Sequence, residues 1–425
     1  MFSIANSKWS ALSMSTLAFT LNFAVWTMFA ILGIGIKAEI GLSETQFGLL
    51  VATPMLSGAF ARLPMGLLAE RFGGRLVFTM QLLFVAAPTY GLAFASDYWH
   101  YLVFGLFVGI AGASFAVGVT YISAWFDSNE QGLAMGIFGA GNVGVAISNL
   151  LIPFIMFSYG WREVPQYYAA ALVVMAVVFW IFTTTDPRHL KRQESGEHPS
   201  FEEHMRPVLE LRVWRMGFYY FFVFGGFVSL ALWLPQYFVN EYGLTLQHAS
   251  YATLAFTLPA AFVRVLGGWF ADNIGARNVN WWVFWICMVC LFFLSYPQTT
   301  MTIHGIDREV NLNIGINVYL FTAIIFIMGV AMGFGKASIF KLVHDYYPKN
   351  MGAVGGMVGS IGAMGGFVLP ILFGIAADLT SIRSSCFMLL YGVLGLCMIW
   401  MYYAIKLDEH LERVREANSS DFLLR

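Results

Sequence analysis

The chain is a succession of long apolar runs separated by short polar connections. Each run is close to the length of about 20 apolar residues that a helix needs to cross a hydrocarbon core about 30 Å thick. The runs predict twelve membrane-spanning helices over residues 12–36, 46–70, 76–95, 99–124, 132–158, 165–184, 213–239, 247–272, 279–297, 313–342, 351–377 and 383–405. We therefore expect an all-α membrane protein.

The polar segment at residues 185–212 is longer than the other connections and divides the spans six and six. Its charges and two prolines are typical of a linker with one surface helix. We expect an N-terminal six-helix bundle over residues 1–184 and a C-terminal six-helix bundle over residues 213–405. Residues 406–425 are polar and amphipathic, and we expect a tail that is either solvated or lies along the membrane face.

The sequence repeats itself at half its length. Residues 60–75, FARLPMGLLAERFGGR, superpose on residues 262–277, FVRVLGGWFADNIGAR, at a constant offset of 202. The offset aligns Arg62 with Arg264 and places both arginines about two turns inside an apolar run. Such a repeat indicates duplication, and in an apolar chain it is typical of a transporter built from two halves. Two bundles related by pseudo-two-fold symmetry are therefore expected.

Composition supports the membrane assignment. Hydrophobic residues make up 59% of the chain and charged residues 11%, with a mean hydropathy of +0.70, whereas soluble domains carry about 25% charged residues. No nucleophile–base set or metal cluster stands out at membrane depth, so we expect no enzyme activity, cofactor, metal or nucleic-acid partner. Cys287 and Cys290 lie in a span without His or acidic neighbours, which favours packing over metal binding.

The distribution of Lys and Arg predicts the orientation, because cytoplasmic loops are enriched in both. The side of both termini carries sixteen of them: Lys8, Arg71, Arg75, Arg188, Lys191, Arg192, Arg206, Arg212, Arg215, Arg277, Lys341, Lys349, Lys406, Arg413, Arg415 and Arg425. The opposite side carries four: Lys37, Arg162, Arg308 and Arg383. Both termini and the linker are therefore expected in the cytoplasm.

The three remaining cations, Arg62, Arg264 and Lys336, fall inside spans, where no Asp or Glu lies at comparable depth. Arg62 precedes Glu70 by eight residues, and Arg264 precedes Asp272 by the same distance. At about 1.5 Å per residue this places each arginine about 12 Å inward. A charge at this depth costs about 2.5–3.5 kcal/mol on insertion scales, so it calls for a reason.

One interpretation is that each arginine snorkels to the interface or is satisfied by backbone carbonyls and water. The favoured interpretation is that the missing counter-charge is the substrate, because a guanidinium offers a planar fork of donors to a planar oxyanion. The arginine pair then predicts a small anion held between the halves near the midplane. Lys336 is either a snorkelling residue or a titratable group that exchanges a proton as the anion arrives, which makes it a candidate for proton coupling.

Glycine is concentrated in two segments, residues 136–144 (GIFGAGNVG) and residues 355–366 (GGMVGSIGAMGG), on equivalent spans of the two halves. Small residues at such spacing let helix backbones approach closely. Asn142 differs from its neighbours because its amide can donate to an anion or link helices. Tight packing alone is the favoured interpretation for most of these glycines, and the alternative is a role in conformational change for Gly139, Gly141, Gly144, Gly362, Gly365 and Gly366.

These residues carry a family resemblance. GLLAERFGGR at 66–75 and GWFADNIGAR at 268–277 resemble the loop motif of the major facilitator superfamily, with Glu70 where aspartate is usual and Asn273 in place of an arginine. GAGNVG at 139–144 and IGAMGGFVLPILFG at 361–374 resemble the paired signature segments of the nitrate/nitrite porter family. Together the motifs span both halves of the chain.

The resemblance implies that Arg62 and Arg264 bind the anion and that Asn142 donates a hydrogen bond near the site. It also implies that aromatic rings line the site and select planar nitrate or nitrite over tetrahedral anions, with the lining residues Phe23, Phe115, Tyr220 and Phe224. The lysine in the tenth span and GGFVSLALWLPQYF at 225–238 resemble the branch that couples nitrate uptake to protons.

The sequence thus predicts a monomeric nitrate importer in the bacterial inner membrane, working with protons by alternating access. Its partners would be nitrate, nitrite, protons and the lipid bilayer. Nitrate/nitrite antiport and transport of a small monocarboxylate stay open as alternatives. An anion sensor is a further alternative, although the linker and tail are short.

Overall fold

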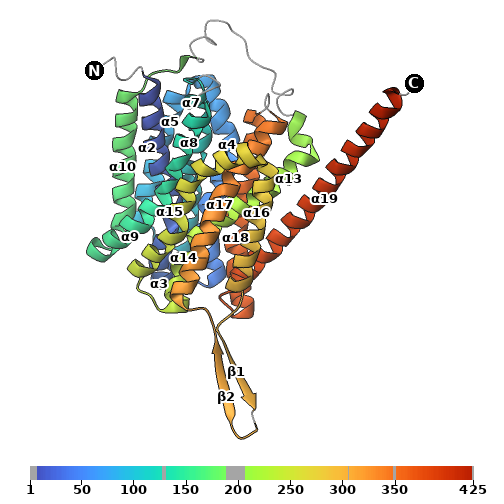
Figure 1. Cartoon of the computed structure of the whole chain (residues 1–425). Helices are drawn as coiled ribbons and strands as arrows, with labels where there is room; N and C mark the ends of the chain where they lie inside the picture. The colour runs from blue at the N-terminus through green and yellow to red at the C-terminus, as the bar shows by residue number, and fades with distance from the viewer. Residues whose placement is uncertain (1–6, 127–130, 188–205, 305, 348–350, 424–425) are drawn as a thin grey trace.

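The protein is described by a computed structural model in which residues 7–126, 131–187, 206–304, 306–347 and 351–423 are placed. Long helices run roughly parallel through the molecule, and those of the first half of the chain lie beside those of the second half (Figure 1). Eleven helices in the described residues are long and apolar enough to cross a membrane, or twelve when the bent helix over residues 246–274 is counted as one span. The predicted all-α fold with twelve spans is confirmed.

The first half contains six spans, several of which are divided by a break in the α-helix. Its α-helices are α2 (Lys8–Thr27), α3 (Phe29–Ile40), α4 (Glu44–Phe72), α5 (Gly74–Gly91), α6 (Tyr98–Val108), α7 (Ser114–Ser123), α8 (Gln131–Gly139), α9 (Gly144–Tyr159) and α10 (Glu163–Phe182). The 3₁₀ turns between them are η1 (Leu92–Phe94), η2 (Gly109–Ala113) and η3 (Ala140–Val143).

The second half follows the same plan. After the 3₁₀ turn η4 (Arg206–Leu209), its α-helices are α13 (Leu211–Tyr220), α14 (Phe227–Tyr242), α15 (Leu246–Phe270), α16 (Ala276–Leu294), α17 (Val318–Tyr346), α18 (Met351–Thr380) and α19 (Ser385–Leu423). Two segments are π-helical, η5 (Phe221–Gly226) between α13 and α14 and η6 (Ala271–Gly275) after α15. Most of the predicted linker lies outside the described residues.

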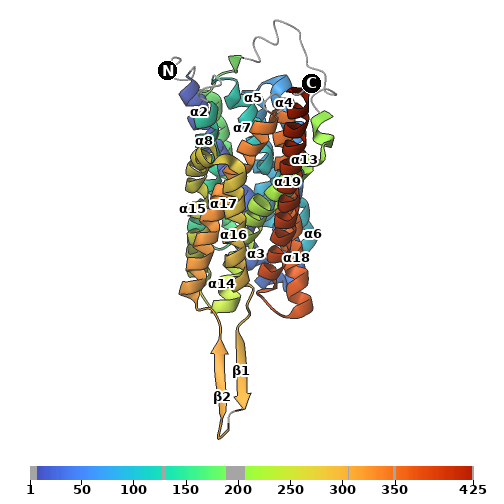
Figure 2. The same ribbon diagram turned by 45° about the vertical axis from the view of Figure 1, so that its right-hand side comes forward.

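A β-hairpin is the main feature that the sequence analysis did not predict. Strands β1 (Thr299–His304) and β2 (Glu309–Ile314) pair antiparallel and project from the end of the bundle opposite both termini (Figure 2). Thr–Asn hydrogen bonds join the strands on one face, at Thr300–Asn313 and Thr302–Asn311. The tenth span therefore begins at Val318, and its predicted start at residue 313 is wrong because the alternating residues there have the period of a strand.

The predicted tail also has a definite form. α19 continues without a break through the polar residues up to Leu423, so the twelfth span and the tail are one helix of 39 residues. The C-terminal part of this helix diverges from the bundle (Figure 1).

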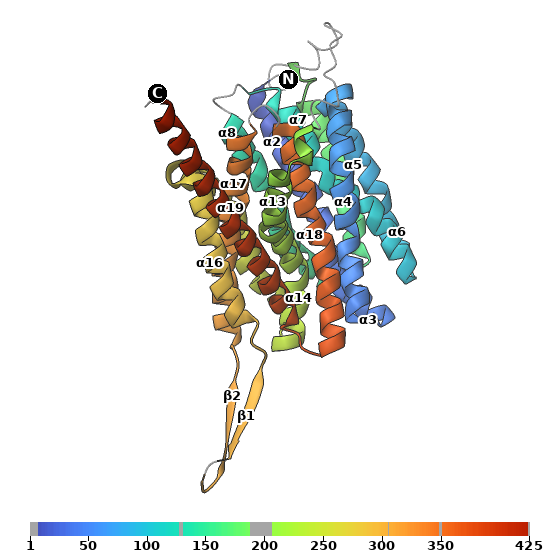
Figure 3. The same ribbon diagram turned by 90° about the vertical axis from the view of Figure 1, so that its right-hand side faces the viewer.

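The two halves meet along α4 and α18, which run side by side (Figure 3). At the hairpin end, Asp378 on α18 accepts hydrogen bonds from the backbone N–H groups of Glu44, at 3.2 Å, and Thr45, at 2.8 Å, and from the Thr45 hydroxyl. A carboxylate at a helix N-terminus meets unpaired N–H groups and the positive end of the helix dipole. Asp378 of one half thus caps the first turn of α4 in the other.

Close backbone approach reinforces this contact. A Cβ atom at Gly48 of α4 would overlap the carbonyl of Pro370, and one at Gly374 of α18 would overlap the carbonyl of Glu44. The hairpin end is therefore held together by a helix cap and by glycines that admit the opposing backbone.

Asp378→Ala should loosen the hairpin end, because it removes the acceptor of three hydrogen bonds between the halves. Since Asp378 is exposed, the loss should be about 1–2 kcal/mol. Electron spin labels at Trp99 and Leu379, both exposed at this end on opposite halves, should report longer distances in the variant. Asp307→Ala, in the exposed hairpin loop, is the matched control. An unchanged distance distribution for Asp378→Ala would show that the Asp378 cap does not hold the two halves together at this end.

Candidate anion-binding site

Arg62 lies on α4 with only 7% of its surface exposed. Its Nε donates to the carbonyl of Gly112 at 3.4 Å, and its Nη1 donates to the carbonyl of Gly359 at 2.7 Å. Gly112 belongs to η2 in the same half, whereas Gly359 belongs to α18 in the other half. The guanidinium therefore links the two halves in the interior of the protein.

Arg264 reaches across the same boundary from the other side. It lies on α15, is half-buried, and its Cζ stands 6.0 Å from the centroid of the Phe115 ring on α7. A Cβ atom at Gly139, at the end of α8, would lie 3.5 Å from Cζ of Arg264. Each arginine thus contacts a glycine in the Gly-rich segment of the opposite half, as pseudo-two-fold symmetry requires.

Lys336 completes a group of three cations. Its side chain is fully buried on α17, and its Nζ lies 3.5 Å from the centroid of the Phe227 ring, where the negative face of the ring attracts the charge. Within the described residues Nζ has no hydrogen-bond partner. Arg264 interacts electrostatically with both Lys336 and Arg62, so the three charges are neighbours. The snorkelling interpretation of Lys336 is wrong, since no part of the side chain reaches the surface.

None of these cations takes part in an ion pair within the described residues. Asp272, eight residues after Arg264, pairs with Lys341 at 3.2 Å, and Asp345, nine residues after Lys336 on α17, pairs with the same lysine at 2.9 Å. In the part of the chain that the structure describes, the contacts of Arg62, Arg264 and Lys336 are with carbonyl dipoles and aromatic side chains, which carry no net charge. Such a group favours an anion.

The second half supplies two of the expected aromatic residues. Tyr220 and Phe224 stack with ring centroids 5.0 Å apart and an angle of 3° between the planes. The Phe224 ring lies 5.4 Å from Cζ of Arg62. Tyr220 lies close enough to both arginines to interact with them electrostatically. Sequence analysis placed both rings at the site, and the structure brings them to the arginines.

The first half supplies the other two within a larger cluster. Phe23 and Phe115 both pack against Phe19, with ring centroids 5.8 and 5.6 Å apart. Phe115 also stacks on Phe138 at 5.6 Å, and Phe23 meets Trp26 edge to face at 5.5 Å. Sequence analysis missed Phe19, Trp26 and Phe138. The signal for Phe19 and Trp26 was the spacing of residues 19, 23 and 26, which places three rings on one face of α2.

Asn142 is buried in η3, with 2% of its surface exposed. Its Nδ2 has no hydrogen-bond partner within the described residues. A buried amide donor without a partner costs about 1–3 kcal/mol, so this group is available to an oxygen atom of a ligand. Its assignment to the substrate is a prediction that the geometry leaves untested.

The selected glycines permit close helix contacts. Cβ atoms at Gly141 and Gly144 would overlap Phe19 and the Thr20 carbonyl on α2, and one at Gly362 would overlap the Tyr220 ring. A Cβ atom at Gly365 would also overlap its neighbour, 2.7 Å from the carbonyl oxygen of Phe221, whereas Gly366 and Gly139 pack less tightly, with a Cβ atom 3.1 Å from Val228 and 3.5 Å from Arg264. Gly362 thus sets the position of Tyr220.

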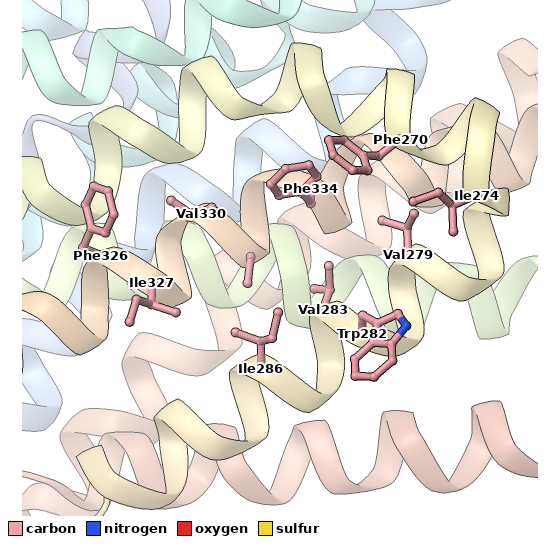
Figure 4. Close-up of a pocket in the computed structure, with 11 residues that line it drawn as sticks. Phe270, Ile274, Val279, Trp282, Val283, Ile286, Phe326, Ile327, Val330 and Phe334 are labelled. Carbon is pink, nitrogen blue, oxygen red and sulfur yellow. The ribbon is translucent and has the colours of Figure 1, made fainter.

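A separate groove faces outward between the end of α15, α16 and α17 (Figure 4). It has a volume of about 370 Å³ and an apolar lining that includes Phe270, Val283 and Phe334. Because it offers no charged side chain, it is unsuited to an inorganic anion.

Two pseudo-symmetric six-span halves that meet at a buried cationic centre define a secondary transporter. Residues 14–306 match the Major Facilitator Superfamily. Over 407 residues the chain is 40% identical to a probable nitrate/nitrite antiporter, NarK1, of Thermus thermophilus, covering 92% of this chain and 90% of that protein. It is also 31% identical to a probable nitrate transporter, NarT, of Staphylococcus carnosus, covering 92% and 95%. The chain belongs to the major facilitator superfamily and, within it, to the nitrate/nitrite porter family.

Two further comparisons agree with this assignment. A nitrite extrusion protein of Bacillus subtilis is 29% identical and covers 96% of this chain and 98% of its own length. The crystal structure of a bacterial homologue of the human lysosomal transporter Spinster, inward-facing and occupied, has a TM-score of 0.70 at 15% identity, covering 93% of this chain and 96% of that one. The latter likeness concerns the fold alone.

Gly362→Ala should destabilise the protein by about 1–3 kcal/mol, because the added methyl group displaces the buried Tyr220 ring. Gly356→Ala on the same helix meets no atom within 4 Å and should be neutral or slightly stabilising. Thermal unfolding of the purified protein in detergent measures both. Equal unfolding temperatures for the two variants would show that Gly362 does not set the position of Tyr220.

Proposed function

We propose that this protein imports nitrate across the bacterial inner membrane by symport with protons. The observation that carries the proposal is the pair of arginines from equivalent positions in the two halves, each of which contacts the other half. An anion held by both would neutralise their mutual repulsion and draw the halves together. The names of the relatives, which refer to nitrate and nitrite, support the choice of anion.

The contacts of Arg62 give this binding a mechanical consequence. Its Nη1 hydrogen bond to Gly359 joins α4 to α18. An anion oxygen that takes this N–H replaces a carbonyl of the opposite half, and the charge-assisted bond to the anion is stronger than the bond to the carbonyl. Substrate binding would therefore replace the direct Arg62–Gly359 bond by contacts through the anion and let α4 and α18 shift against each other, as alternating access requires.

The flat rings at the site support a planar substrate. The rings of Tyr220 and Phe224 are parallel to each other. Phe23 and Phe115 belong to the aromatic cluster of the first half, where both pack against Phe19. A planar oxyanion can lie against such faces and direct its oxygen atoms to donors in its own plane. A tetrahedral anion would push an oxygen atom into a ring.

Energetics favour coupling to protons or to a second anion. Moving one elementary charge through the membrane potential involves about 2.3 kcal/mol per 100 mV, and nitrate enters against a negative interior. Import is therefore favoured by symport with at least one proton per nitrate, which cancels the moved charge, or by exchange for an internal anion. Lys336 supports the first route, because it is a buried amine without a hydrogen-bond partner in the described chain and lies beside Arg264.

Nitrate/nitrite exchange is the second candidate. The relative that is 40% identical bears the name of a probable antiporter, and the relative from Bacillus subtilis is named for nitrite extrusion. Exchange needs no titratable group, so Lys336 would then serve only to attract the anion. In both cases we place the termini in the cytoplasm and the hairpin outside, in agreement with the distribution of Lys and Arg.

Arg62→Ala and Arg264→Ala should each reduce nitrate uptake into liposomes by about ten- to hundred-fold, since a hydrogen bond to a charged group contributes about 1.5–3 kcal/mol. Lysine at either position should restore only part of the activity, because an ammonium lacks the planar fork. Arg383→Ala, which removes an exposed arginine paired with Glu241, is the control. Unimpaired uptake by both arginine variants would contradict the proposal that the two arginines hold the anion.

Lys336→Gln should separate the two modes of coupling. The wild-type protein is placed in liposomes that contain a pH dye and no nitrite. Nitrate added outside should then acidify the interior. The variant should lose this acidification but keep nitrate/nitrite exchange, since exchange moves no proton. Lys341→Gln, which changes a partly exposed lysine paired with Asp272 and Asp345, should behave like the wild type. Uptake by the wild type only with preloaded nitrite would establish exchange and reject symport.

A further inference from the structure

Trp26 is the largest side chain buried beside Arg62. It lies on α2 with none of its surface exposed, and its Nε1 donates to the carbonyl of Pro54 on α4 at 2.8 Å. This carbonyl lies two turns before Arg62 on the same helix. The hydrogen bond therefore ties the first span to the second two turns before the arginine.

Two glycines admit the indole. A Cβ atom at Gly58 of α4 would lie 2.8 Å from Nε1 of Trp26, and one at Gly112 of η2 would lie 2.5 Å from its Cε2. Both distances are too short for real atoms, so the ring fills the space between α4 and η2 completely. Phe23 closes a further side with its edge-to-face contact.

Trp26 also faces the guanidinium. Cζ of Arg62 lies 5.6 Å from the centroid of the Trp26 ring, within the range of a cation–π contact. Arg62 donates to the carbonyl of Gly112, the same glycine that packs on the indole. Trp26 thus contacts the Arg62 guanidinium directly and also packs against Gly112, whose carbonyl accepts a hydrogen bond from Arg62.

The second half has no counterpart. At the offset of 202 the residue is Val228, and Arg264 is correspondingly less buried than Arg62. The two arginines are therefore held differently: Arg62 contacts the indole and two carbonyls, whereas Arg264 is half-buried and lies beside Tyr220 and the Phe115 ring.

We propose that Trp26 is a positioning residue that holds Arg62 in the orientation needed to bind the anion. This inference rests on the proposed function, because it assumes that Arg62 contacts the substrate. A fixed donor loses little conformational entropy on binding, so the contribution of Trp26 should appear in affinity. It should hardly affect the rate at saturating substrate.

Trp26→Phe removes the N–H donor and one ring but keeps an aromatic side chain. In nitrate-loaded transport assays we expect its KM to rise about ten-fold, with the maximal rate within two-fold of the wild type. Trp161→Phe is the matched control, because Trp161 also donates through Nε1, to Glu39, and lies 4.4 Å from the Arg162 guanidinium at the hairpin end. Its KM should not change.

A double-mutant cycle with Arg62→Lys tests whether Trp26 acts through Arg62. If it does, Trp26→Phe should have little further effect on KM in the Arg62→Lys background. Equal effects in both backgrounds, or a lower maximal rate with unchanged KM, would overturn the inference while leaving the proposed function intact.

A second cycle needs no substrate. In the unfolding temperatures of the same four proteins, the shifts caused by Trp26→Phe and Arg62→Lys should be non-additive. If the wild type carries no nitrate, the proposed function fails and this cycle still decides the contact: additive shifts overturn the positioning role, and non-additive shifts support it.

Discussion

The cost of placing three cations in a membrane interior is the constraint on which the rest of the structure depends. Water is absent there, so Arg62, Arg264 and Lys336 need partners from the protein or from a ligand. Arg62 has two carbonyls and two aromatic faces, Arg264 has Tyr220, and Lys336 has the face of Phe227. These partners are dipoles and quadrupoles without net charge. The cluster therefore keeps its positive charge, and the proposal that the substrate is an anion rests on this charge.

Breaks in the helices supply part of this environment. The 3₁₀ turns η2 and η3 carry Gly112 and Asn142, and the π-helical segment η5 carries Phe224. Such segments change the hydrogen-bonding pattern of the backbone, so carbonyls and amides can turn toward the site, and they often mark functional positions. The glycines act in the same region by letting rings and backbones approach, as Gly362 does for Tyr220.

The contacts between the halves differ in kind from one end of the α4–α18 pair to its interior. At the hairpin end, Asp378 caps α4 and two glycines admit the opposing backbone, so this end is held by contacts independent of the substrate. In the interior, the Arg62–Gly359 hydrogen bond joins the same helices through a donor that an anion would take over. On the proposed function, a ligand would replace one contact between the halves while the other persists, and its binding energy would then favour a change of conformation.

The sequence by itself determined the spans, the repeat and the cations. Apolar length and buried charge carry large free energies of transfer, and these depend on residue type and depth alone. Tyr220 and Phe224 were placed through family resemblance, since aromatic residues make up 17% of the chain and composition could not select them. Only the tertiary structure identified Trp26, Phe227 and the carbonyls of Gly112 and Gly359, because every residue has a carbonyl and packing decides which one meets a guanidinium. The tertiary structure also revealed the hairpin. Its two strands are stabilised by pairing with each other, and this pairing is not visible in the apolar pattern of either strand alone.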